Sequence, residues 1–228
     1  MQRRRFTAAI VSATGASLWP ALSQAQFIEA QAAAGIRAAL ERGAVAAVNL
    51  LARTDGFLGN PKVRIPLPGY LQDAERLLRA TGQQRRVDEL LTSMNRAAEA
   101  AVPEARSLLV SAVKSMTVTD ARQVLSGGDD SVTRFFADKT RGSLSARFLP
   151  VVTRQTERVD LIEKYNALAG RAATFGLLKK EDANVQQYVT ARAIDGLYLM
   201  IGEEERNIRR NPVATGSAIL KQVFGGLR

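Results

Sequence analysis

The sequence predicts an all-α fold, a single multi-helix globular domain with one extended segment rich in proline and glycine, preceded by a signal peptide. Three observations predict it. Apolar residues recur at helical spacing along nearly the whole chain after residue 25. No long linker of proline, glycine or serine divides residues 26–228, so these residues are expected to form one domain. With 228 residues, 46% of them hydrophobic and 24% charged, the chain can bury one substantial core.

Residues 1–25 are typical of a signal peptide. Arg3, Arg4 and Arg5 form a positively charged start, an apolar stretch follows, and Ser23-Gln24-Ala25 supplies small residues where a signal peptidase cuts. We therefore expect cleavage after Ala25 and export to the periplasm. The general secretion route accounts for these features, and Arg3-Arg4-Arg5-Phe6 also fits a twin-arginine signal. No transmembrane segment is expected in the mature chain.

The helices of the first half follow from apolar spacing and from residues that begin or end a helix. Two Ala-rich helices are expected at residues 27–42 and 44–52, with Gly43 between them. A third covers residues 87–101, and Pro103 suits the first turn of the next, which runs to Met116. Thr117 and Asp120 have the spacing of a capping box, which opens a short helix to residue 125.

The helices of the second half follow from the same kinds of signal. Gly127-Gly128 ends the short helix, and Asp129 or Asp130 caps the following one. Pro150 is expected to open another helix, to about residue 169. Residues 180–210 should form the longest helix, and Pro212 should start the last, which ends at residue 224.

The segment from Thr54 to Tyr70 breaks the helical pattern. Three of the seven prolines and three glycines fall within it, and its later part alternates apolar and polar residues as an extended stretch does. A long irregular segment in a helical domain indicates a binding surface. Its polar residues are the candidate binding residues: Asp55, Asn60, Lys62, Arg64 and Tyr70. The alternative is a connection whose apolar residues enter the core, namely Phe57, Leu58, Ile65 and Leu67.

A second candidate site is the basic stretch from residue 134 to 158, which holds six basic and two acidic residues. Arg147, Arg154 and Arg158 are the candidate anion patch, with Arg154 and Arg158 on one helix face. Removal of residues 1–25 takes away three arginines and no acid, so the net charge falls from +10 to +7 and the mature chain stays basic. The alternative is an ordinary solvated surface.

The composition excludes many kinds of chemistry. The chain has no Cys and no His, which excludes Cys nucleophiles, Cys- or His-ligated metals and Ser-His-Asp hydrolysis. We expect no catalytic residues, no metal site and no cofactor. A hydrolase or lyase that uses carboxylates such as Asp55 or Asp195 remains an alternative.

Helix spacing suggests further polar pairs near the C-terminus. Arg192 and Asp195 have the spacing of an ion pair on the same face as Tyr188. Glu203-Glu204-Glu205 is interpreted as a solvated face that pairs with nearby arginines, because consecutive helical residues do not converge on one point.

Several motifs between residues 30 and 225 are distinctive. They are Thr54-Asp-Gly-Phe-Leu-Gly-Asn-Pro with Arg64-Ile-Pro-Leu-Pro68, Met94-Asn-Arg-Ala-Ala-Glu-Ala-Ala101, Tyr188-Val-Thr190, Ile194-Asp-Gly-Leu-Tyr198 and Asn211-Pro-Val-Ala-Thr-Gly216. Together they resemble a family of exported bacterial proteins catalogued as domain of unknown function 4197. The resemblance implies a bacterial envelope protein of helical build, with no assigned activity.

These observations predict an exported, non-catalytic binding or envelope-interaction protein. The expected partner is an anionic envelope component or a small apolar or anionic ligand, since an exported protein seldom meets nucleic acid. The alternatives are the carboxylate enzyme and a structural oligomer whose Ala-rich residues 27–52 pack on a partner. A large exposed apolar patch on those residues would favour the oligomer.

Overall fold

The computed structural model describes residues 19–69, 75, 80, 82, 84–128, 130–157, 162–163, 166 and 184–210, with side chains omitted at 19–29 and 208–209. All regular secondary structure in this part of the chain is helical, which confirms the all-α prediction. The elements are α1 (Trp19–Ala52), α3 (Gln84–Ala101), the 3-10 turn η1 (Val102–Glu104), α4 (Ala105–Lys114), α5 (Val118–Ser126), α6 (Ser131–Thr156) and α8 (Val185–Arg210). The predicted last helix, residues 212–224, lies outside the described residues.

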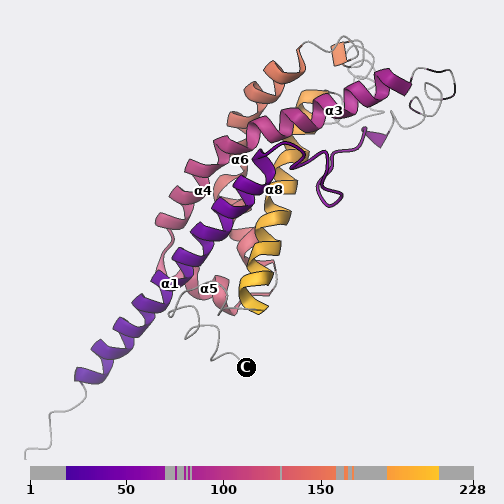
Figure 1. The fold of residues 1–228 in the computed structure, drawn as a ribbon. Helices are drawn as coiled ribbons and strands as arrows, with labels where there is room; N and C mark the ends of the chain where they lie inside the picture. Colours follow the sequence, from indigo (N-terminus) through magenta and orange to yellow (C-terminus); the bar gives the residue numbers. More distant parts are fainter. Residues whose placement is uncertain are drawn as a thin grey trace, which may run out of the picture.

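The helices pack around one core. Helix α6 contacts α8, α3, α4 and α5, while α1 contacts α8, α4 and α5 (Figure 1). Phe136 and Phe148 of α6, Met94 of α3, Leu51 of α1 and Leu197 of α8 are fully buried in a single apolar cluster. The N-terminal part of α1 projects beyond the other helices (Figure 1). None of the described helices has both the length and the apolar character of a membrane span.

Helix α1 is continuous, so the predicted interruption at Gly43 is wrong. Gly43 lies in mid-helix and is buried, between the buried Leu40 and Ala44. Burial of a small-residue face against the bundle offsets the cost of a helical glycine, which is about 1 kcal/mol. Arg37 also ties α1 to the end of α4, because its guanidinium donates to the Met116 carbonyl at 3.0 and 2.8 Å.

Helix α6 is continuous through Pro150, so the predicted helix start at that residue is also wrong. Pro150 is exposed, and the buried residues recur every fourth position on either side of it. These residues are Phe136, Thr140, Leu144, Phe148, Val152 and Thr156. Their packing outweighs the lost backbone hydrogen bond of the proline, which costs about 3 kcal/mol in a helix interior.

Of the other predicted helix features, some are confirmed and some are wrong. Helix α5 begins with a capping box in which Asp120 N–H donates to Thr117 Oγ1 at 3.0 Å and Thr117 N–H donates to Asp120 Oδ2 at 2.9 Å. Asp130 precedes α6 but makes no side-chain cap, and its carboxylate pairs with Arg134 at 3.1 Å. Helix α8 buries its predicted apolar stripe, but at 26 residues it is shorter than α1, with 34.

Candidate functional site

The predicted irregular segment corresponds to a connection that we call the Arg53–Pro68 loop, made of turns, bends and residues without helix or strand. Its apolar side chains enter the core. Phe57 is 0% exposed, Ile65 1% and Leu67 4%, whereas Leu58 is half-buried. The alternating exposure of residues 63–67 follows the sequence pattern. The loop is therefore anchored by packing, as the second of the two interpretations expected.

Asn95 of α3 holds the loop by its backbone. The Asn95 side chain is fully buried; its Oδ1 accepts from Ile65 N–H at 2.8 Å, and its Nδ2 donates to the carbonyls of Ile65 at 3.0 Å and Leu91 at 2.8 Å. A loop backbone that is taken out of water needs such partners. Asn95 thus supplies the hydrogen bonds that a neighbouring strand would otherwise make.

Glu99, one turn further along α3, holds the first half of the loop. It is 5% exposed, and its Oε1 accepts from the N–H groups of Phe57 at 3.0 Å and Leu58 at 3.1 Å. Its Oε2 pairs with Arg96 at 2.7 Å, and Arg96 also pairs with Asp55 at 2.8 Å. Asp55 has a φ of 64°, an uncommon conformation for a residue other than glycine. Contacts with both carboxylates raise the pKa of Arg96.

Helix α8 closes the other side of the loop. Tyr188 Oη donates to the Pro66 carbonyl at 3.2 Å. A Cβ atom on Gly196 would lie 2.9 Å from Phe57 Cε1 and 3.2 Å from Val63 Cβ, so only glycine permits this close approach. The loop is consequently held between α3 and α8.

Most of the predicted binding residues of the loop make ion pairs or hydrogen bonds with other residues of the chain. Lys62 Nζ contacts both carboxylate oxygens of Glu203 at 2.8 Å, and Asn60 Oδ1 accepts from Lys62 N–H at 3.2 Å. Arg64 is exposed. Tyr70 lies outside the described residues. Asp55, Asn60 and Lys62 therefore help to hold the loop together, and their role in ligand binding stays a prediction.

The polar contacts of α8 differ from the ion pair predicted for Arg192 with Asp195 and from the solvated face predicted for residues 203–205. Arg192 lies over the Tyr188 ring, 5.2 Å from its centroid, and Asp195 pairs with Arg141 of α6 at 2.9 Å. Glu205 is only 6% exposed, so the interpretation of residues 203–205 as a solvated face is wrong for this residue. Its position follows from packing of α8 against the start of α6, where Ser131 Oγ donates to Glu205 Oε1 at 3.5 Å.

The arginines of the second candidate site lie on α6. Arg147 and Arg154 are both exposed, and since α6 is continuous, their seven-residue separation places them on one helix face. We call this pair the arginine row. Arg147 donates to Ser107 Oγ of α4 at 3.4 Å, and no ion pair joins either arginine to a carboxylate of the described residues. Arg158 lies outside those residues.

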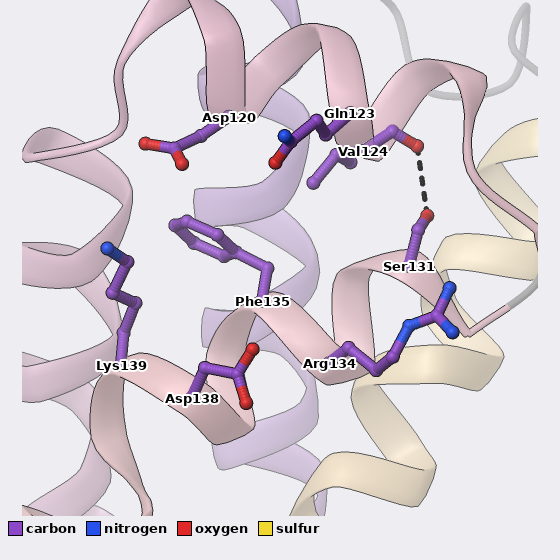
Figure 2. Close-up of a pocket in the computed structure, with 8 residues that line it drawn as sticks. All are labelled: Asp120, Gln123, Val124, Ser131, Arg134, Phe135, Asp138 and Lys139. Atoms are coloured by element: carbon purple, nitrogen blue, oxygen red, sulfur yellow. Dashed lines mark hydrogen bonds between the residues drawn. The ribbon is translucent and has the colours of Figure 1, made fainter.

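A pocket of about 440 Å³ opens between α5 and α6 (Figure 2). Sequence reasoning missed it, because its two walls meet only in the folded chain. In Figure 2 the Phe135 ring lies between the Asp120 carboxylate of α5 and the Asp138 carboxylate of α6, with the Lys139 side chain beside it. The lining residues are Asp120, Gln123, Val124, Ser131, Arg134, Phe135, Asp138 and Lys139.

The described residues offer little support for the carboxylate enzyme. They contain no group of three acidic, His or Cys residues that could hold a metal ion. Asp55 and Asp195 are each paired with an arginine. Asp120 and Asp138 do share a pocket, but hydrogen bonds from Thr117, with a smaller contribution from Lys139, lower the pKa of Asp120. A general acid would need a raised pKa.

The oligomer alternative predicted an exposed apolar patch on residues 27–52, of which the side chains of 27–29 lie outside the described part of the chain. Most apolar residues of 30–52 pack into the chain's own core, while Ala30, Ala34, Ala38 and Ala46 are exposed. The large hydrophobic residues that stand exposed in the described part of the chain are Val118 of α5 and Leu199 of α8. Residues 30–52 therefore expose alanines but no large hydrophobic side chain.

Fold and loop together define a class of protein, a single helical domain whose irregular loop is held by buried polar residues of α3. The family model described as "Protein of unknown function (DUF4197)" matches residues 26–225, and the chain belongs to this family. No curated protein and no solved structure matches the chain.

The motifs that carried the family resemblance meet at one place in the structure. Loop residues 54–61 and 64–68 contact Asn95, Arg96 and Glu99 of the second motif and Tyr188 and Gly196 of the third and fourth. The motif at residues 211–216 lies outside the described residues. The resemblance was thus the one sequence signal that pointed to Asn95 and Glu99, which composition and spacing did not single out.

Proposed function

We propose that this chain is an exported, non-catalytic binding protein of the bacterial envelope that attaches to an anionic envelope component through the arginine row. The observation that carries the proposal is the position of Arg147 and Arg154. Both are exposed on one face of α6, and neither is neutralised by a described carboxylate. Lys62, Arg96, Arg134 and Arg141, in contrast, have carboxylate partners.

Guanidinium groups without a carboxylate partner suit phosphate and carboxylate groups, because their planar donors can form paired hydrogen bonds. A rise of about 1.5 Å per residue places the two Cα atoms of the row about 10 Å apart along the helix. Each basic residue near an anionic membrane surface contributes about 1 kcal/mol of binding free energy. The net charge of the mature chain, +7 after removal of residues 1–25, adds a favourable long-range attraction.

Export is part of the same proposal, and residues 1–25 are its basis. Cleavage after Ala25 would remove the first turns of α1. The first described buried residue of α1 is Ala33, so the described core would keep all its members. Mass spectrometry of the protein purified from its host's periplasm should give an N-terminal Gln26.

Sedimentation with phospholipid vesicles tests the binding proposal. The mature protein should bind vesicles that contain phosphatidylglycerol better than vesicles of phosphatidylcholine alone, and added salt should weaken this binding. The double variant Arg147→Gln, Arg154→Gln should bind about thirtyfold more weakly. The matched control is Arg53→Gln with Arg85→Gln, which removes the same charge from exposed positions outside the row. Equal losses in the two double variants would contradict the arginine row as the binding surface.

A further inference from the structure

The pocket between α5 and α6 is a third candidate binding site, distinct from the loop and from the arginine row. Its volume of about 440 Å³ lies within the range of small-molecule sites. Two helices form its walls. Three lining residues come from α5 and five from α6, namely Asp120, Gln123 and Val124, and Ser131, Arg134, Phe135, Asp138 and Lys139. Phe135, at 9% exposure, gives the pocket an apolar surface (Figure 2).

The polar groups in this pocket differ in how far the fold already engages them. Arg134 is paired with Asp130 at 3.1 Å, and Ser131 Oγ donates to the Val124 carbonyl at 2.9 Å. One oxygen of Asp120, Oδ2, accepts from Thr117 N–H and Oγ1 at 2.9 and 2.8 Å. No ion pair joins Asp138 or Lys139 to an opposite charge among the described residues. A carboxylate and an ammonium group therefore remain for a ligand.

The arrangement of these charges limits the ligand chemistry. The Phe135 ring has a carboxylate of α5 on one side and a carboxylate of α6 on the other (Figure 2). An aromatic face and nearby carboxylates both attract an organic cation. Lys139, beside the same ring, would repel a simple cation but would pair with an anionic group on the ligand.

We propose that the α5–α6 pocket binds a small zwitterion, such as a free amino acid with an apolar side chain. Its ammonium group lies over Phe135 between Asp120 and Asp138, and its carboxylate pairs with Lys139. Its apolar part covers Phe135 and Val124. No covalent step is involved.

Isothermal titration calorimetry with the mature protein tests the pocket. The three probes share one apolar group. Leucine carries both charges, isoamylamine carries only the ammonium group, and 4-methylpentanoate carries only the carboxylate. Leucine should bind with a dissociation constant in the millimolar range or below, and each half should bind at least about tenfold more weakly. No leucine binding up to about 10 mM would overturn the proposal, and equal binding of isoamylamine would overturn the assignment of a zwitterion.

Two exposed positions allow variants that leave the core unchanged. Asp138→Asn and Lys139→Gln should each weaken leucine binding about fivefold, because each removes one charge-assisted contact. Lys114→Gln, at an exposed position at the end of α4, is the matched control and should bind leucine like the wild type. Unchanged binding in both pocket variants would overturn the proposal. The outcome is separate from that of the arginine row, because Asp138→Asn should still bind anionic vesicles.

Discussion

The side chain of Asn95 makes hydrogen bonds to both backbone polar groups of Ile65, at 2.8 Å to its N–H and 3.0 Å to its carbonyl. Asn95 is fully buried, and Ile65 is 1% exposed. The contact therefore lies away from water, where a polar group without a partner costs about 1–3 kcal/mol. Towards the other end of the loop, Glu99 accepts hydrogen bonds from the N–H groups of Phe57 and Leu58. These two residues of α3 fix the Arg53–Pro68 loop.

Replacement of Asn95 by Ala should lower the free energy of unfolding by about 3 kcal/mol, because it leaves buried groups of Ile65 without partners. The measurement is urea unfolding followed by circular dichroism. Thr92→Ala, on the exposed side of the same helix, is the control and should change stability by less than about 0.5 kcal/mol. If the two variants were equally stable, Asn95 would not hold the loop.

Gly196→Ala should destabilise the protein by about 1–2 kcal/mol. The added methyl group meets Phe57 and Val63, and this crowding outweighs the gain in helix propensity. Gly142→Ala is a matched control, since Gly142 is also helical and has open space around its Cβ position. That variant should be up to about 1 kcal/mol more stable than the wild type. Thermal unfolding of both variants checks that the two stability changes have opposite signs. A stabilised Gly196→Ala would refute the close approach of the loop to α8.

Asp120 should make stability depend on acid pH. Its pKa in the folded protein is lowered from the ordinary 3.8, first by the backbone and side-chain hydrogen bonds from Thr117. A lowered pKa means that the carboxylate favours the folded state above pH 3.8, and that this contribution is lost as the pH falls through the folded value.

Urea unfolding of the wild type and Asp120→Asn at several pH values measures this contribution. The stability difference between the two should be constant near neutral pH and should shrink below pH 3.8. Glu89→Gln, at an exposed position of α3, controls for the loss of one negative charge. A difference that stayed constant down to strongly acidic pH would show that the charge of Asp120 does not contribute.

Pro150→Ala should raise the free energy of unfolding, by up to about 3 kcal/mol, because α6 regains a backbone donor in its interior. Pro103→Ala should have the opposite sign or no effect, since Pro103 lies in the first turn of η1, where its ring favours the helical conformation. Thermal unfolding of the two variants compares them directly. A strongly destabilised Pro150→Ala would mean that α6 requires the proline.

Local sequence patterns predicted the parts of the fold that depend on neighbouring residues. Thr117 and Asp120 predicted their capping box because both partners lie within one turn. The buried stripe of α8 followed from its spacing in the same way. At Gly43 and Pro150 the sequence predicted helix boundaries that the structure lacks. The low helix propensity of glycine and proline is outweighed there by tertiary packing of the continuous helix.

The candidate sites depended more on distant partners. The arginine row needed only the continuity of α6, whereas the role of Asn95 depends on Ile65, 30 residues earlier in the chain. Lys62 was predicted as a binding residue, and its ion-pair partner Glu203, 141 positions away, carries no local sequence signal. The α5–α6 pocket likewise exists only once the two helices have packed. Single-sequence reasoning cannot supply such pairings.

Amide hydrogen exchange measured by NMR tests the central claim, that buried polar side chains of α3 hold the irregular loop. The amides of Phe57, Leu58 and Ile65 should be protected although they lie outside any helix. In Glu99→Ala, protection should fall at Phe57 and Leu58 and persist at Ile65. Fast exchange at all three amides of the wild type, or protection that survives in the variant, would contradict the claim.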